Sequence, residues 1–174
     1  MYKVIFLIPV MFVFACAEPT NEEEQVFSGD ALGTTYQVKF FHSEKLDINN
    51  ALDSIFRVIN SSMSTYQANS DISRINAGDP DVIIDEHFRE VFLASKKIYE
   101  ESGGMFDPTV GTLVNACGFG PGGPQKELKV GELDSIRRLV GFNKLQLTED
   151  GRIQKKHPEI YIDFNAIAKG YAVD

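Results

Sequence analysis

The sequence has no tryptophan and only two cysteines, Cys16 and Cys117, among its 174 residues. Two cysteines are too few for the disulfide framework that stabilises many small secreted domains, so a packed core must hold the fold. A composition of 43% hydrophobic and 24% charged residues is globular and leaves room for one such core. A zinc or thiol site would need further ligands clustered with Cys117, and none are. We therefore interpret Cys117 as a small packed residue.

Positive charge is also scarce. Lysine and arginine number 17 against 25 aspartates and glutamates, which gives a formal net charge of −8. No basic cluster offsets this balance, so the sequence excludes a nucleic-acid footprint. A small anionic ligand would need a local basic group or a metal ion, because the overall field repels it.

Long hydrophobic runs are missing as well. Lys3 precedes a twelve-residue apolar run, Val4–Ala15, which has the length of a signal peptide and is too short to span a bilayer. Residues 1–15 are therefore predicted to be a signal peptide of an exported protein.

The four residues Val13-Phe-Ala-Cys16 resemble a bacterial lipobox, loosely matched because Phe14 stands where smaller residues are usual. Cleavage before Cys16 would leave it as a lipidated first residue, anchored to a bacterial membrane and facing the periplasm. A plain secretory peptide cut nearby would predict the same compartment without the anchor. The polar residues that follow, including Glu22–Glu24, are typical of a disordered tether. We expect residues 16–27 to form a lipidated tether and residues 28–174 to form the domain.

Periodicity in the domain predicts a mixture of helices and antiparallel strands. Polar and apolar residues alternate in Thr35–Phe40, as in a half-buried strand. Lys144–Thr148 and Arg152–Gln154 flank an Asp-Gly turn and predict a hairpin, and Ile160–Ile162 predicts another strand. Because no regular βαβ alternation occurs, the predicted class is α+β around one core.

Two long helices are predicted, each with an apolar stripe and an aspartate cap. Asp47 is expected to cap the first helix and Asp85 the second, which Gly103 ends. The stripes, interpreted as core, comprise Ile48, Ala51, Leu52, Ile55, Phe56 and Ile59 in the first helix and Phe88, Val91, Phe92, Ile98 and Tyr99 in the second. We read His87, Lys96 and Lys97 as solvated surface.

Three stretches carry candidate chemistry. Ser61–Asn76 is rich in hydroxyl groups around Tyr66, which predicts a ligand-facing loop with Tyr66 stacked on a flat ring, a capped loop with Ser70 or Asp71 starting a short helix, or both. Gly103–Gly111 joins two glycines to the Asp107 carboxylate and a proline, and a short helix is expected to begin at Thr109. The glycine–proline loop Gly118–Pro124 is not counted among these stretches, because it lacks the spacing of a dinucleotide or P-loop fingerprint.

The third stretch, Asp163–Asp174, follows the predicted strand with a carboxylate, small residues and Lys169. Backbone amides at a strand-to-helix turn, with a lysine nearby, suit a phosphate group. An ordinary β–turn–α junction with a solvated lysine has the same pattern, so both interpretations stay open on this stretch alone.

Taken in order, the motifs resemble the FAD:protein FMN transferase family, the exported ApbE-type flavin-transfer lipoproteins. The resemblance covers about Gly29 to the end of the chain. The motifs that carry it are Leu32–Tyr36, Met63–Gln67 with Asp71–Asn76, Gly103–Gly111, Val114–Asn115 with Gly118–Gly120, and Asp163–Asp174.

The resemblance implies an enzyme that binds FAD and, with Mg²⁺, transfers the FMN half to a threonine hydroxyl of an exported acceptor protein, releasing AMP. The FAD-binding positions it implies are Leu32, Tyr66, Met105, Phe106, Asp107, Asp163, Lys169 and Ala172. Ala166 matches the position whose carbonyl binds magnesium. The sequence departs from the family pattern at Leu32, where methionine is usual, at Asn165, where glycine is common, and at Cys117, where tryptophan is common.

Family members continue beyond the final motif into a region that supplies an aspartate and a threonine for magnesium and further FAD contacts. From this we expect the 174 residues to be the N-terminal part of a longer protein, with little activity on their own. Two other functions fit the same residues: an exported FAD-binding lipoprotein without transferase activity, and a structural envelope lipoprotein that keeps only the fold.

Overall fold

The computed structural model describes residues 21–120 and 130–174. The predicted signal peptide, the lipidation site at Cys16, the first part of the tether and most of the predicted glycine–proline loop lie outside the described residues. Within the described ranges, no helix is both long enough and apolar enough to cross a membrane.

The first two strands form a long hairpin. β1 (Glu23–Ala31) pairs antiparallel with β2 (Thr34–His42), from Glu23 opposite His42 to Ala31 opposite Thr34. The strand predicted in this region is confirmed, but the boundary of the tether is wrong, because residues 23–27 belong to β1. The glutamates of this segment suggested disorder, whereas the antiparallel register with β2 runs without a break from Glu23 to Ala31.

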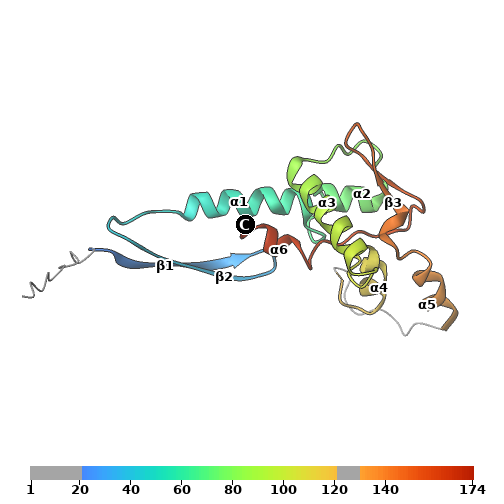
Figure 1. Cartoon of the computed structure of the whole chain (residues 1–174), viewed down its shortest axis with the longest axis horizontal. Helices are drawn as coiled ribbons and strands as arrows, with labels where there is room; N and C mark the ends of the chain where they lie inside the picture. The colour runs from blue at the N-terminus through green and yellow to red at the C-terminus, as the bar shows by residue number, and fades with distance from the viewer. Residues whose placement is uncertain (1–20, 121–129) are drawn as a thin grey trace, which may run out of the picture.

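Helix α1 (Asn49–Met63) lies along the hairpin, and the two form an arm that projects from the compact part of the molecule (Figure 1). Phe56 packs on Tyr36 of β2, with ring centroids 4.9 Å apart. The predicted stripe is only partly core: Ile59 is buried, but the Ile55 side chain is 45% exposed, because the first half of α1 meets a two-stranded ribbon and not the core. Ile48, not Asp47, occupies the N-cap position, although Asp47 accepts a hydrogen bond from the backbone amide of Asn49 at 3.1 Å.

Two helices follow, and both of their predicted caps are confirmed. Ser70 caps α2 (Asp71–Ala77), accepting from the amide of Ser73, and Asp85 caps α3 (Glu86–Glu101), accepting from the amide of Phe88 at 2.7 Å. The prediction that Ile98 belongs to the core is wrong, because Ile98 is 38% exposed. Ser95 of the same helix is fully buried instead. The core is formed by side chains from several elements, among them Ile72, Ile75, Phe88, Val91, Phe92 and Phe164.

The remaining elements are short. They are the 3₁₀ turn η1 (Pro108–Val110), α4 (Gly111–Ala116), α5 (Val130–Arg137), the 3₁₀ turn η2 (Phe142–Lys144), β3 (Leu145–Leu147), β4 (Ile153–Lys155) and α6 (Ala168–Tyr171). The β3–β4 hairpin confirms the prediction from its Asp-Gly turn, and the short helix near Thr109 is confirmed by η1 and α4.

Ile160–Ile162 does not form the predicted strand. Ile160 and Ile162 are fully buried, as the apolar pattern suggested, but no strand pairs with them in the described residues. The side chain of Asn76, at the end of α2, takes the place of a neighbouring strand: its Nδ2 donates to the carbonyl of Ile162, and its Oδ1 accepts from the amide of Ile162, both at 2.8 Å.

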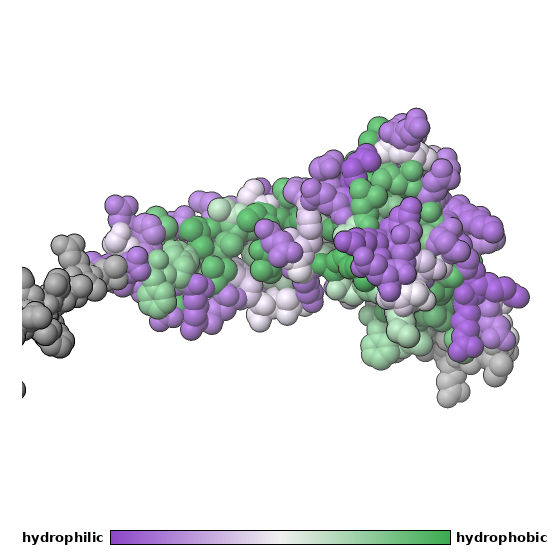
Figure 2. All heavy atoms as spheres, in the orientation of Figure 1, coloured by the Kyte–Doolittle hydropathy of each residue, from purple (hydrophilic) through white to green (hydrophobic). Residues whose placement is uncertain are grey.

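The class is α+β, as predicted. Two separate two-stranded antiparallel sheets combine with helices around one apolar cluster at the base of the arm (Figure 1). Figure 2 shows hydrophobic residues at the surface of both the compact part and the arm, with hydrophilic residues beside them. The last helix, α6, lies at the junction of the arm and the compact part, which is where the candidate site is found.

Candidate functional site

A cavity of about 250 Å³ opens where the arm joins the compact part. Its wall comes from the β1–β2 turn, the end of α1, the loop after α1 and the beginning of α6. The structure therefore brings together three of the predicted site residues, which are 34 or more positions apart in sequence: Leu32, Tyr66 and Lys169. Met63, Gln67 and Asn165 line the same cavity.

Leu32 has an unusual backbone conformation. The register pairs Ala31 with Thr34, so Leu32 and Gly33 form a two-residue hairpin loop, and their φ angles are +51° and +73°. Two positive φ angles match the twist of a hairpin, but asparagine or glycine normally supplies them. A leucine held in this region places strain at the rim of the cavity, where strained residues are characteristic of binding sites.

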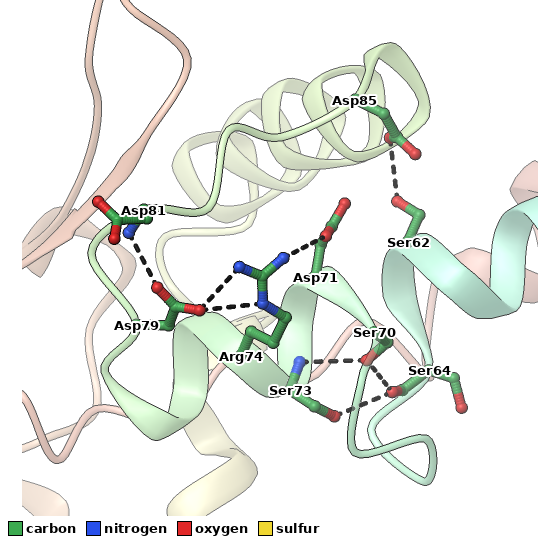
Figure 3. Close-up of polar contacts among 9 residues, drawn as sticks. All are labelled: Ser62, Ser64, Ser70, Asp71, Ser73, Arg74, Asp79, Asp81 and Asp85. Atoms are coloured by element: carbon green, nitrogen blue, oxygen red, sulfur yellow. Dashed lines mark hydrogen bonds and ion pairs between the residues drawn. The ribbon is translucent and has the colours of Figure 1, made fainter.

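The loop that carries Tyr66 is closed by serines (Figure 3). Ser70, which is fully buried, donates its hydroxyl to the carbonyl of Ser64 at 2.6 Å, and Ser73 donates to the same oxygen at 3.1 Å. The predicted capped loop is thus confirmed. Tyr66 itself is 65% exposed, so its ring is available to a ligand, and its stacking role stays a prediction.

Charged and hydroxyl side chains tie the three main helices together behind this loop (Figure 3). Ser62 of α1 donates to Asp85 at the start of α3, at 3.0 Å, and Arg74 of α2 binds Asp79 at 2.8 Å. Burial, reinforced by the Asp85 carboxylate, raises the pKa of Asp71, which lies between these pairs. The Ser62–Asp85 bond ties the end of α1, which lines the cavity, to the start of α3.

Asp163 begins a tight turn under the cavity. Its Oδ1 accepts from the backbone amide of Asn165 at 2.7 Å, and its Oδ2 accepts from the side-chain amide of Asn165 at 3.2 Å. Burial raises the pKa of Asp163, and the two hydrogen bonds from Asn165 oppose that shift. Asp163 does not itself line the cavity, but it orients Asn165, which does.

The segment Gly103–Gly111 reaches Asp163 through the backbone. The amide of Asp163 donates to the carbonyl of Pro108 at 2.8 Å. A Cβ atom at Gly111 would lie 2.6 Å from the Tyr161 ring and 3.2 Å from the Asp163 side chain, so glycine is required for this close approach.

The three predicted FAD contacts of this segment have different environments. Met105 is 94% exposed and Phe106 is half-buried, and neither lines the cavity. Asp107 is buried, and its Oδ1 accepts from both the amide and the hydroxyl of Thr109, at 2.8 and 2.6 Å. The Thr109 hydroxyl in turn accepts from the amide of Gly141 at 2.7 Å. Asp107 therefore has a structural role, since it holds Thr109, which connects this segment to Gly141.

A second, larger cavity of about 740 Å³ lies between the hairpin and α1. Leu32 and Lys169 contribute to both cavities, and Ala172 lines only this one. The remaining wall is mostly apolar and includes Phe56 and Val38. Lys169 is thus a cation that the two cavities share.

For a divalent metal ion, the described residues supply an incomplete set of ligands. Ala166 is exposed, and its carbonyl accepts no backbone hydrogen bond within the part of the chain that the structure describes. In the same part, no group of three or more histidine, cysteine, aspartate or glutamate side chains is close enough to hold a metal ion. A hard cation takes six or more oxygen ligands, so Ala166 fits as one contributor and cannot form the site alone.

Sequence reasoning missed Gln67 and Met63 as cavity residues and Asn76 as the residue that fixes Ile162. Gln67 and Met63 flank Tyr66 in the same polar motif, which is the signal that could have identified them. Asn76 has no comparable local signal, because its partner is 86 residues away.

The comparisons with known proteins agree with each other. The ApbE family model matches residues 32–174. Among curated relatives, the FAD:protein FMN transferase of Haemophilus influenzae is 30% identical over 97% of this chain and 52% of its own length, and that of Vibrio cholerae is 30% identical over 98% and 52%.

Solved structures give the same result. The flavin transferase ApbE from Vibrio cholerae superposes with a TM-score of 0.78 at 30% identity, covering 88% of this chain and 52% of that one. The apo flavinyl transferase ApbE from Pseudomonas stutzeri gives 0.79 at 31% identity, covering 88% and 50%. The chain therefore spans about half the length of the relatives that it matches.

Proposed function

The chain belongs to the ApbE family, and from this premise we propose that the protein takes part in transferring the FMN moiety of FAD to a threonine hydroxyl of an exported acceptor protein, with release of AMP. The observation that carries the proposal is the meeting of Leu32, Tyr66 and Lys169 at one cavity. An apolar contact, an exposed aromatic ring and a lysine are the groups that a flavin ring joined to phosphates requires.

In the proposed reaction, the threonine oxygen attacks the phosphorus of the FMN phosphate. A new P–O bond forms, the P–O bond to the AMP phosphate breaks, and the threonine proton is lost to solvent or to a base. Negative charge accumulates on the leaving AMP phosphate, where a nearby lysine stabilises it. We assign that role to Lys169 and the contacts with the flavin ring to Tyr66 and Leu32, because all three line one cavity.

The proposal includes magnesium, with the carbonyl of Ala166 as one ligand and further ligands from outside the described residues. When bound, the ion would neutralise charge on the phosphate oxygens. We also propose export and anchoring to a bacterial membrane through lipidated Cys16, because the start of the sequence resembles a lipoprotein signal.

One observation favours a second candidate function, an exported protein that binds FAD without transferring FMN. The described residues include the proposed flavin contacts, whereas Ala166 is the one metal ligand proposed among them, and no cluster of three or more histidine, cysteine, aspartate or glutamate side chains joins it there. Binding without the metal would leave the phosphate bond intact.

A single assay separates the two functions. The full-length protein is mixed with FAD, Mg²⁺ and an acceptor carrying the target threonine, and flavin fluorescence on the acceptor is measured after denaturation. We expect denaturation-resistant fluorescence with an equal amount of AMP, and neither product with a Thr→Ala acceptor or with excess EDTA. FAD binding without labelled acceptor would favour the second function, and the absence of FAD binding would contradict both.

A further inference from the structure

Tyr171, the last residue of α6, contacts two side chains that lie one turn apart on α3. Its hydroxyl is 2.5 Å from Oε2 of Glu90 and 2.8 Å from Nδ1 of His87, and the His87 and Tyr171 rings meet edge to face with centroids 5.8 Å apart. His87, expected from the sequence to be solvated surface, is exposed but is also a partner of α6.

The chemistry of the three groups fixes the direction of these hydrogen bonds. A carboxylate only accepts, so the Tyr171 hydroxyl donates to Glu90, and its oxygen then accepts from Nδ1–H of His87. Burial and the Glu90 carboxylate raise the pKa of Tyr171 to about 12, so the phenol keeps the proton that it donates. Asp85 and Glu86 are the other charged groups that face it.

Helix α6 depends on such contacts. It has four residues, one of which is Gly170, and its N-cap residue, Ile167, makes no side-chain capping bond. A single helical turn with a glycine inside it is not stable in water by itself. Its position must therefore come from tertiary contacts, namely the buried Ala168 and the bonds of Tyr171 to α3.

The geometry of a helix connects this contact to the site. Each residue rotates the helix by about 100°, so Lys169 and Tyr171, two positions apart, point in nearly opposite directions. Tyr171 faces α3, and Lys169 lines both cavities. Fixing the rotation of α6 through Tyr171 thus fixes where Lys169 points.

We propose that His87 and Glu90 are positioning residues that act through Tyr171 to hold α6 in the rotation that presents Lys169 to the flavin nucleotide. This inference rests on the proposed function, because FAD is the ligand assigned to Lys169.

The first test measures hydrogen exchange of the amides of residues 168–174 without any ligand. Tyr171→Phe removes the hydroxyl and keeps the ring, and Glu90→Gln removes the carboxylate charge. We expect both to accelerate exchange in this segment. The matched controls, Tyr99→Phe and Glu100→Gln, change the same groups elsewhere on α3 and should leave the segment unchanged. Unchanged exchange in Tyr171→Phe would overturn the proposal.

The second test measures FAD affinity by flavin fluorescence in a double-mutant cycle. Tyr171→Phe should raise Kd about threefold to tenfold, the effect of losing one or two hydrogen bonds. In a Lys169→Ala background the same substitution should change Kd by less than about twofold, because the residue that it positions is gone. A purely structural role would lower the melting temperature and give the same Kd ratio in both backgrounds.

Failure of the positioning role and failure of the proposed function give different results in the two experiments. Equal Kd ratios with or without Lys169, or an unchanged Kd in Tyr171→Phe, would overturn the positioning role. If the wild-type protein bound no FAD, the proposed function would be wrong, and the exchange experiment would still decide whether the Tyr171 hydroxyl and Glu90 hold α6.

Discussion

At the scale of single residues, Leu32 combines a strained backbone with a place on the cavity wall. A non-glycine residue at φ +51° gives up stability that a residue tolerant of left-handed backbone would recover. Its side chain packs against the core cluster and also lines the cavity in which the proposed flavin ring would lie. Stability and binding therefore make opposite demands at this position.

We expect Leu32→Asn to stabilise the hairpin turn by up to about 1 kcal/mol, less the apolar contact that is lost, and to weaken FAD binding. Urea unfolding and flavin fluorescence measure the two effects. Leu32→Met is the control: it keeps an apolar side chain and the backbone strain, and it should retain FAD affinity. If Leu32→Asn bound FAD as tightly as the wild type, Leu32 would not be a flavin contact.

Asp163 gives a prediction about pH. Because burial raises its pKa, the folded chain holds this proton more tightly than the unfolded chain does. Stability contributed by Asp163 therefore falls as pH rises from the ordinary value of 3.8 through the raised value in the folded state. Asp163→Asn removes this dependence and keeps an oxygen for the amide of Asn165.

The variant should thus gain stability relative to wild type as pH rises through that window, and the gain should be greatest at neutral pH. Denaturant unfolding at several pH values measures the difference. A difference that does not vary with pH would show that burial of the Asp163 carboxylate costs nothing.

Single-residue roles were predictable where the signal was local. Tyr66 and Lys169 were identified from their short motifs and lie at one cavity, although their contacts with FAD remain predictions. Asp107 was predicted as a ligand contact, and no local pattern indicated that it binds Thr109, which in turn holds Gly141. Roles of this kind depend on partners that only the folded chain brings together.

At the scale of elements, two helix caps and a hairpin turn were predictable because each depends on a few adjacent residues, whereas the predicted cap at Asp47 was wrong by one position. Ser70, Asp85 and the Asp-Gly turn acted as expected. The misplaced elements were those whose backbone partners are distant. Residues 23–27 became a strand because β2 lies opposite them, and Ile160–Ile162 did not, because a side chain took the partner's place.

The Asn76 contact predicts a large effect of a small substitution. Asn76→Ala leaves the amide and carbonyl of buried Ile162 without partners, which should lower the free energy of unfolding by about 2–4 kcal/mol. Asn50→Ala, at an exposed position of α1, is the matched control and should change it by less than about 0.5 kcal/mol.

Urea unfolding of both variants measures these changes. Asn76→Ala should also weaken FAD binding, because Ile162 leads directly into Asp163. If the two variants were equally stable, the Asn76 side chain would not substitute for a strand.

At the scale of the whole molecule, the arm and the compact part meet at the place where the site residues converge (Figure 1). The α+β class and the family were predictable from the order of motifs along the chain. The convergence of Leu32, Tyr66 and Lys169 at one junction was not predictable, because it depends on how α1 and the β1–β2 hairpin pack beside α6. In a chain with a net charge of −8, Lys169 gives this junction a local cation for an anionic ligand.

The central claim is that this junction binds the flavin of FAD, and Tyr66 offers the most direct test. The measurement is the Kd for FAD of the wild type, Tyr66→Ala and Tyr66→Phe, with melting temperature as the check on folding. Because Tyr66 is 65% exposed, we expect the melting temperature to stay constant. We expect Kd to rise about threefold to tenfold in Tyr66→Ala and to stay near the wild-type value in Tyr66→Phe, which keeps the stacking ring. Wild-type affinity in Tyr66→Ala would contradict the account.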